Sequence, residues 1–395
     1  MLTEFDDYPV HQTTLPVAHP SSGDPNVYDR YFFNGYDPDG GWYFGVALGI
    51  YPNRQVIDGA FSFLHDGVQQ SVFASGRLPD ERSETSIGPI AVEVVKPLRV
   101  SRVRVTAEQL GIAADLTFTA RSVALEEPRQ RLLDGPHTVM DVTRLTQLGC
   151  WGGTVRAGEH EFALDDRRSR GTKDRSWGVR PVGQPLPGAP APGLGSVGGL
   201  FFLWAPLDLG DECRFLSLFE RPDGTRWHES AASTPLLAPG DPVCGRAAER
   251  VVRPARSVRY ELSLRPGTRR GASAAIEYDF GAPAERGAQP VDRVSLTPLL
   301  DFQMKGLGYF HPGWPHGNWR GEEEVGGDTW RASDLDPLAL ENIHTQQLCR
   351  LHSEGPGGPK DGTGVLEQLI IGPHEPSGLR GLLDGYVPGP VGDPS

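Results

Sequence analysis

The sequence contains few cysteines, and they lie far apart. Cys150, Cys213, Cys244 and Cys349 are the only four thiols in 395 residues, and no two of them form a Cys-x-x-Cys pair. A disulfide framework and a structural zinc site both need closer spacing. We therefore expect buried free thiols, and no metal.

Long apolar runs and a basic surface are also missing. No run approaches the roughly eighteen consecutive apolar residues of a membrane span, and Met1–Pro20 is acidic and has no signal-like apolar segment. The formal net charge is -13, whereas binding to nucleic acid needs clustered cations. The arginines within Leu98–Arg104 stand at near-alternate positions, which is typical of one solvated strand face. We expect a cytoplasmic protein with no integral membrane segment and no nucleic-acid partner.

Glycine, proline and alternating apolar residues are abundant instead. The chain has 50 Gly and 36 Pro, with an apolar fraction of 38%, a composition that favours many short strands joined by turns. Period-two alternation predicts half-buried strands. It occurs in the following segments: Trp42–Ile50, Ala114–Phe118, Val258–Leu264 and Ile276–Phe280. The protein is therefore predicted to be mainly β.

The length of the chain exceeds that of one ordinary hydrophobic core, so two domains are expected. The stretch Val182–Val197 is rich in Pro and Gly and lacks periodicity, which predicts an N-terminal domain over 1–185 and a C-terminal domain over 186–386. Gly281–Gln289 is predicted to be a loop, and Leu335–Ile343 a short helix. Closed barrels or tight sandwiches hide the edges of so many strands, and a small barrel offers a cavity for one hydrophobic ligand.

The segment Lys173–Arg180 combines an acid, two arginines and an indole. On a strand, Asp174 and Ser176 face one side and Trp177 faces the other. Asp174 could act as a general acid if burial raises its pKa, with Trp177 lining an apolar pocket. The alternative is a structural Asp–Arg pair next to a core tryptophan.

A second unusual segment is Gly306–Glu322, whose Gly and Pro content excludes a helix. His311 and His316 therefore cannot be paired by helical geometry, and a metal site is weakly supported. With Glu322 orienting an imidazole, the segment could supply acid and base groups. The alternative is a turn whose indoles cap the second barrel and whose histidines satisfy backbone groups. Its aromatic candidates for lining a ligand site are Tyr309, Trp314 and Trp319.

Aromatic residues also crowd the early strands, where Arg30–Asp37 leads into Gly41–Phe44. Such crowding is more typical of a barrel core than of a binding site. Tyr36 and Trp42 are nevertheless candidates for contact with a ligand, because the Tyr36 hydroxyl could serve a cavity.

These three segments carry a family resemblance. Asp174-x-x-Trp177-Gly178, the early aromatic strands and the His-Pro-x-Trp-x-His-Gly-x-Trp pattern within Gly306–Glu322 together resemble the superfamily of carotenoid 1,2-hydratases and AttH-like, kievitone hydratase-like proteins, in an uncharacterised bacterial branch. Gly171 and Thr172 depart from it, because they replace an upstream aromatic residue. The resemblance implies two fused lipocalin-like antiparallel β-barrel domains.

The resemblance also implies an enzyme: a hydratase or dehydratase, an isomerase or a cyclase that protonates a carbon–carbon double bond of a hydrophobic, isoprenoid-type molecule without a cofactor. Asp174 is then the acid, and His311 or His316 the base. The alternative is a lipocalin-like carrier of a lipid, steroid or terpenoid that does no chemistry, since a fold alone does not decide function. The two differ in whether Asp174 and the His311–Glu322 segment meet in one buried cavity.

Overall fold

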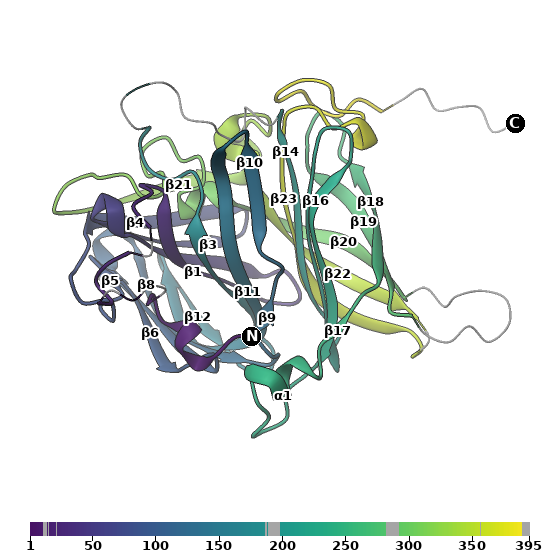
Figure 1. Ribbon diagram of the computed structural model, residues 1–395, viewed down its shortest axis with the longest axis horizontal. Helices are drawn as coiled ribbons and strands as arrows, with labels where there is room; N and C mark the ends of the chain where they lie inside the picture. Colours follow the sequence, from purple (N-terminus) through teal and green to yellow (C-terminus); the bar gives the residue numbers. More distant parts are fainter. Residues whose placement is uncertain are drawn as a thin grey trace, which may run out of the picture.

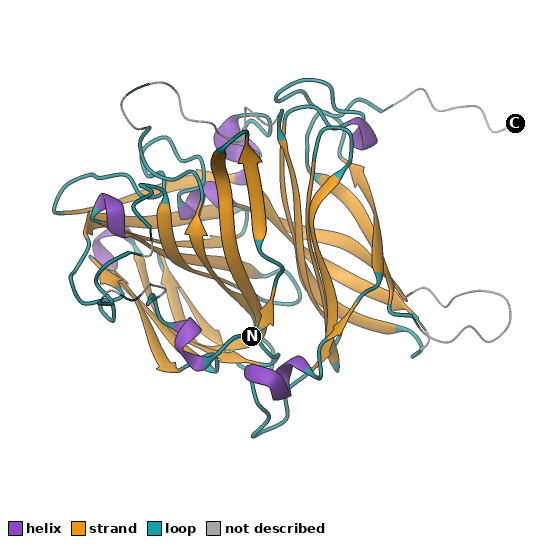
Figure 2. Cartoon of the chain, in the orientation of Figure 1, coloured by secondary structure: helices purple, strands orange, loops and turns teal. Residues whose placement is uncertain are grey.

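The computed structural model describes residues 1–10, 14, 16–20, 22–185, 188, 198–281, 292–355 and 357–388. Within them it confirms a mainly β chain with two large antiparallel sheets (Figure 1 and Figure 2). Much of the predicted connection Val182–Val197 and of the predicted loop Gly281–Gln289 lies outside the described residues.

The first sheet curls into a nearly closed barrel, and its main path runs β21-β4-β3-β2-β1-β13-β11-β8-β7-β6-β5. The short β9, β10 and β12 pair with the long β11. Its strands are β1 (Val27–Tyr36), β2 (Trp42–Tyr51), β3 (Val56–His65), β4 (Val68–Arg77), β5 (Ser86–Ile87), β6 (Ile90–Lys96), β7 (Val100–Ala107), β8 (Ile112–Ala120), β9 (Leu125–Glu126), β10 (Gln130–Asp134), β11 (His137–Ala157), β12 (His160–Leu164), β13 (Arg170–Val179) and β21 (Glu323–Arg331).

The second sheet is an open half-barrel with the order β17-β16-β15-β14-β23-β22-β20-β19-β18. Its strands are β14 (Leu200–Asp208), β15 (Glu212–Glu220), β16 (Arg226–Pro235), β17 (Arg253–Pro254), β18 (Ser257–Leu264), β19 (Gly271–Asp279), β20 (Asp292–Gln303), β22 (Thr345–Glu354) and β23 (Lys360–Ile371). Helical structure is limited to α1 (Gly245–Glu249) and short 3-10 turns, including η1 (Glu4–Asp7), η5 (Met304–Leu307), η7 (Leu340–Asn342) and η8 (Glu375–Ser377). Both lipocalin-like domains are thus built from neighbouring antiparallel strands.

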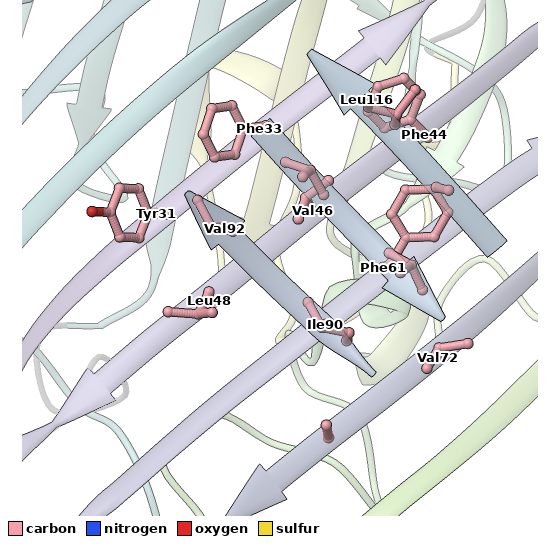
Figure 3. Close-up of a cluster of buried hydrophobic side chains, with 14 of the residues drawn as sticks. Tyr31, Phe33, Phe44, Val46, Leu48, Phe61, Val72, Ile90, Val92 and Leu116 are labelled. Atoms are coloured by element: carbon pink, nitrogen blue, oxygen red, sulfur yellow. The ribbon is translucent and has the colours of Figure 1, made fainter. Parts of the chain in front are cut away.

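The interior of the first barrel is a packed core and not a ligand cavity. Figure 3 shows the aromatic and branched side chains that fill it. Trp151 lies among them and donates its indole hydrogen to the carbonyl oxygen of Asn34 at 2.8 Å. The predicted apolar face of β2, which includes Phe44, Val46 and Leu48, points into this core. The expectation that the barrel itself offers the cavity is therefore not met here.

A second apolar layer lies between the two sheets, where the outer face of the first packs against the second (Figure 1). It includes Tyr43 and Ala47, which stand on the face of β2 opposite to Phe44. The sequence predicted that β2 is half-buried, and this is wrong because both of its faces are covered: one by the barrel core and one by Phe302 and its neighbours.

The second half of the chain also contributes to the first sheet. β21 pairs with β4 along its whole length, from Glu323 opposite Gly76 to Arg331 opposite Val68. The predicted division at residue 185 otherwise separates the strands of the two sheets. The chain therefore crosses back after β20, and this crossing carries the Gly306–Glu322 segment over the outer face of the first barrel.

Other sequence predictions have mixed outcomes. Leu335–Ile343 is not an α-helix, because only the 3-10 turn η7 forms there, after Pro337 has interrupted the segment. All four cysteines are free thiols, and Cys244 is the one that is only partly buried. Among the described residues, no helix is long and apolar enough to cross a membrane.

Candidate active site

A row of polar side chains crosses the layer between the sheets. On the first sheet they stand on the outer face of β11, β13 and β1, and on the second sheet they come from β16, β22 and β23. We call this region the inter-sheet layer. Its polar members are Arg30, Glu127, Arg144, Asp174, Arg180, His228, His316, His344, Gln346 and Glu367. Aromatic residues surround them, among them Phe32, Phe202 and Phe219.

Asp174 lies on β13, the strand that pairs with both β1 and β11. Its Oδ2 atom is 3.2 Å from Nε of Arg144 on β11, and its side chain is only 10% exposed. Burial raises the pKa of Asp174 to about 7; the Arg144 guanidinium acts against this rise, whereas the negative charges of Glu127 and Glu367 add to it. Near neutral pH this carboxyl can therefore both hold and release a proton.

Glu127 follows β9 and is fully buried beside Arg144. Its backbone N–H donates to the carbonyl oxygen of Arg144 at 2.9 Å. Its carboxylate lies 3.1 Å from Nε2 of His228 on β16 and accepts a hydrogen bond from Gln130 at 3.0 Å. Burial opposes ionisation, but the hydrogen bond from His228 and the charge of Arg144 prevail and lower the pKa of Glu127. Glu127 is therefore a permanent negative charge near Asp174.

A second carboxylate–histidine pair comes from the second sheet. Nε2 of His344 lies 2.7 Å from Oε1 of Glu367, and the other carboxylate oxygen accepts a hydrogen bond from Gln346 at 2.6 Å. Gln346 in turn accepts a hydrogen bond from the Tyr43 hydroxyl at 2.6 Å. Nδ1 of His344 is buried and has no hydrogen-bond partner within the described part of the chain. If Nε2 carries the proton toward Glu367, Nδ1 presents a free lone pair, which is the arrangement of an oriented general base.

The Gly306–Glu322 segment reaches this layer through two of its residues. Nδ1 of His316 lies 2.6 Å from Nη1 of Arg30, and its Nε2 lies 2.8 Å from Nη2 of Arg30 and 2.7 Å from the carbonyl oxygen of Leu307. With the proton on Nε2, Nδ1 accepts a hydrogen bond from Arg30 and Nε2 donates one to Leu307. Burial and the charge of Arg30 lower the pKa of His316 well below its usual value. The Tyr309 ring lies 4.4 Å from the ring of His316 and 4.6 Å from that of His344. His316 is thus neutral, and Arg30 occupies its lone pair.

Other predicted residues of this segment take no part in the polar row, although Trp314 packs against the apolar side chains of the layer. Nδ1 of His311 accepts the backbone N–H groups of Gly313 and Trp314, both at 3.0 Å, so this imidazole fixes a turn. Trp314 stacks on Phe73 at 5.7 Å. The indoles of the segment therefore cover the first barrel. The alternative prediction, a turn whose indoles cap the second barrel, names the wrong barrel. Glu322 is 70% exposed and pairs with Arg77, and Trp319 is 44% exposed.

The remaining predicted residues lie on three different surfaces. Tyr36 is in the inter-sheet layer and stacks on Tyr43 at 6.0 Å. Trp42 packs against the barrel core and stacks on Phe44. Trp177 stands on the face of β13 opposite to Asp174, as the alternation predicts, so the two side chains do not share one pocket. Of the predicted residues, Asp174, His316, Tyr309 and Tyr36 come together in one layer.

Sequence reasoning missed Glu367, His344, Glu127 and Arg144. A signal for Glu367 exists in the strand pattern: it has the same parity as Val365 and Leu369, so a charge stands on an apolar face. His344 and Glu127 lie just outside strands β22 and β9, where alternation gives no information. Their convergence depends on how the two sheets pack.

A pocket with a volume of about 630 Å³ opens at one end of the layer. Its walls come from both sheets and from α1: Leu125, Phe215, Ala232, Ala248 and Val252 are apolar, and Glu127 forms part of the wall. A volume of this size is typical of small-molecule sites. Glu127 is the polar member of the inter-sheet layer that lines this pocket, whereas Asp174, His344 and Glu367 do not line it.

No group of three or more His, Cys, Asp or Glu side chains in the described residues is arranged to hold a metal ion. The predictions of a site without a metal and without a cofactor remain predictions. The chemistry available to the layer is proton transfer, by a carboxyl with a raised pKa and an imidazole with a free nitrogen.

Solved structures of other proteins have a fold similar to that of this chain. A kievitone hydratase from Nectria haematococca has a similar structure, with a TM-score of 0.50 and 13% identity over 86% of this chain and 88% of the hydratase. An AttH-like protein from Nitrosomonas europaea aligns with a TM-score of 0.49 and 11% identity over 91% of this chain and 98% of its own. At such identities the similarity concerns the fold alone.

The fold is thus similar to that of a kievitone hydratase, whereas the resemblance of the sequence to carotenoid 1,2-hydratases and to an uncharacterised bacterial branch stays a prediction. No curated protein matches the chain. The model of the Family of unknown function (DUF8625) matches residues 2–380, so the chain belongs to that family.

Proposed function

We propose that this protein is an acid–base catalyst, a hydro-lyase or an isomerase or cyclase, that protonates a carbon–carbon double bond of a hydrophobic small molecule of the isoprenoid type. The observation that carries the proposal is the buried carboxyl of Asp174, held beside Arg144 in an aromatic layer together with a second, oriented carboxylate–histidine pair.

In this mechanism protonated Asp174 donates its proton to one carbon of the double bond, and the other carbon becomes cationic. Ring faces and negative charges stabilise a cation in an apolar site. Phe202 and the carboxylates of Glu127 and Glu367 supply both in the inter-sheet layer. The same carboxylates that raise the pKa of Asp174 thus favour the cation that forms when its proton leaves.

The second half of the reaction needs a base. For hydration, water forms a C–O bond to the cation and gives one proton to Nδ1 of His344; for isomerisation or ring closure, the proton lost from the neighbouring carbon goes to the same nitrogen. Glu367 orients the ring and stabilises the imidazolium that results. Proton return from His344 to Asp174 through solvent restores both groups.

The pocket of about 630 Å³ beside Glu127 is the proposed entrance for the ligand. Its apolar wall residues suit a hydrocarbon body, charged residues such as Arg129 and Glu229 stand beside them, and the backbone of Glu127 donates a hydrogen bond to Arg144. The alternative function, a carrier that binds the same type of molecule without turnover, would use the pocket and not the acid. Substitution of Asp174 should therefore abolish turnover in a catalyst and should leave ligand binding by a carrier unchanged.

The test begins with mass spectrometry of small molecules that co-purify with wild-type protein and with the Asp174→Asn variant. A catalyst predicts different molecules: the product in the wild type and the substrate in the variant, related by one water or by rearrangement. The substrate is then supplied in D2O, where proton donation to carbon predicts a non-exchangeable C–D bond with the wild type only. The same unchanged molecule in both proteins, with no deuterium incorporated, would establish the carrier.

A further inference from the structure

Arg180 is a guanidinium of the inter-sheet layer that forms no direct ion pair within the described residues, although its charge acts on Asp174 and Asp58 from a longer range. It follows β13 on the same face as Asp174 and lies over the Tyr28 ring, with 4.5 Å between Cζ and the ring centroid. The Tyr309 ring lies 5.9 Å away. Nε and Nη2 of Arg180 are buried and make no hydrogen bond to any described residue.

Arg30 adds a second cation whose contacts are all uncharged. It bonds to the His316 ring and to the carbonyl oxygen of Leu307. Its Nε is buried without a partner in the described chain. The neighbouring carboxylate, Asp58, has its own partners, because it accepts hydrogen bonds from the Gly317 backbone at 2.7 Å and from the Tyr51 hydroxyl at 3.1 Å.

Two arginines on neighbouring positions of this sheet form ion pairs. Arg144 pairs with Asp174, and Arg175, on the opposite face of β13, pairs with Asp29 at 2.8 Å. Buried guanidinium groups are ordinarily paired in this way, because an uncompensated buried charge is unfavourable. Arg180 and Arg30 differ from these two, because neither of them forms an ion pair with a carboxylate within the described residues, and Arg180 keeps two buried nitrogens without a partner.

We infer that the Arg180 end of the layer is a binding site for an anionic group of the ligand, so that the substrate class is an amphipathic organic acid with an apolar body. The inference rests on the proposed function in that the ligand occupies the same layer. Planar carboxylate fits the free Nε and Nη2 edge of a guanidinium, which can bind two oxygens at once. The guanidinium also lies over the Tyr28 and Tyr309 rings.

Two matched pairs of probes test the inference: retinoate against retinol, and 8-anilinonaphthalene-1-sulfonate against the neutral N-phenyl-1-naphthylamine. Binding is followed by fluorescence at fixed salt and pH 7.5. The wild type is expected to bind each anion about 10- to 100-fold more tightly than its neutral partner, the range for a charged hydrogen-bonded group. Arg180→Gln removes this preference, and Arg180→Lys keeps part of it.

Arg104→Gln, at an exposed position on β7, is the control and leaves the preference unchanged. Equal binding of anionic and neutral probes by the wild type, an unchanged preference in Arg180→Gln, or no saturable binding of any probe would each overturn the inference. Asp174→Asn separates it from the proposed function. That variant keeps the preference for anions while it loses deuterium incorporation, and a wild type that prefers anions but incorporates no deuterium is a carrier of organic acids.

Discussion

Nε of Arg144 lies 3.2 Å from Oδ2 of Asp174, and yet the pKa of this carboxyl is raised to about 7. A nearby guanidinium ordinarily lowers the pKa of an acid. Here burial outweighs it, because water is excluded from the inter-sheet layer and because Glu127 and Glu367 place further negative charge around the site. On the sequence alone, the alternative to a general acid is a structural Asp–Arg pair. Such a pair exists, with Arg144 as the partner, and it does not prevent Asp174 from being an acid.

This raised pKa makes folding stability depend on pH. In the folded chain Asp174 has a pKa of about 7, against 3.8 for an ordinary aspartate, so between these values the folded state binds a proton that the unfolded state does not. The contribution of Asp174 to the free energy of unfolding therefore falls as the pH rises from the unfolded pKa to the folded pKa. Since Asn mimics the neutral acid, Asp174→Asn should gain about 2–3 kcal/mol relative to the wild type between pH 5 and pH 8.

Urea unfolding at the two pH values measures this change. The control is Asp115→Asn, because Asp115 is half exposed, pairs with Arg102 and has a lowered pKa, so its substitution should change stability little and in the opposite sense. A difference between Asp174→Asn and the wild type that does not vary with pH would mean that Asp174 is ionised throughout.

Arg144 should set the upper pH limit of activity. Arg144→Gln removes the positive charge that acts against the raised pKa of Asp174, so the acid should remain protonated to higher pH. We expect the alkaline limb of the kcat/KM profile to move up by about one pH unit. Arg102→Gln, which removes an exposed arginine on β7, is the matched change and should leave the profile in place.

The sequence predicts parts of this site well and others not at all. Alternation in Lys173–Arg180 correctly separates Asp174 from Trp177, because neighbouring residues of one strand obey local geometry. The residues whose charges act most strongly on Asp174 are Arg144 on β11, Glu127 after β9 and Glu367 on the second sheet. No local sequence pattern predicts that these segments pack together. The His311–Glu322 segment is predicted as one site, whereas in the structure His316 and the nearby Tyr309 contact the polar row, and His311 and Glu322 do not.

Glu367 should matter for catalysis, and Glu322 should not. Glu367→Gln keeps the size of the side chain but removes the charge that orients His344 and stabilises its imidazolium. We expect kcat to fall about 100-fold, the scale of general base catalysis, with the fold retained. Glu322→Gln affects an exposed carboxylate that pairs with Arg77 and should leave kcat unchanged. Equal effects of the two substitutions in steady-state assays would contradict the assignment of the base.

Gly308 lies directly against the imidazole of His316, and its substitution tests the backbone conformation of the Gly306–Glu322 segment. Its φ is +90°, a region that side chains with a Cβ rarely adopt. A Cβ built here would lie 2.8 Å from Cδ2 of His316 and 2.8 Å from the carbonyl oxygen of Trp314. Gly308→Ala therefore combines backbone strain with a collision against the imidazole that Arg30 holds.

Gly210 provides a matched control, since its φ is also +90° but nothing lies within 4 Å of the position that a Cβ would take. Gly210→Ala should destabilise the protein by about 1–2 kcal/mol, from the left-handed backbone alone. Gly308→Ala should destabilise it by about 1–3 kcal/mol more, because packed atoms must move. Chemical denaturation of both variants measures the difference, and displacement of His316 should also weaken ligand binding in Gly308→Ala only. If the two alanine variants unfold with the same free energy, the close approach of Gly308 to His316 does not exist in solution.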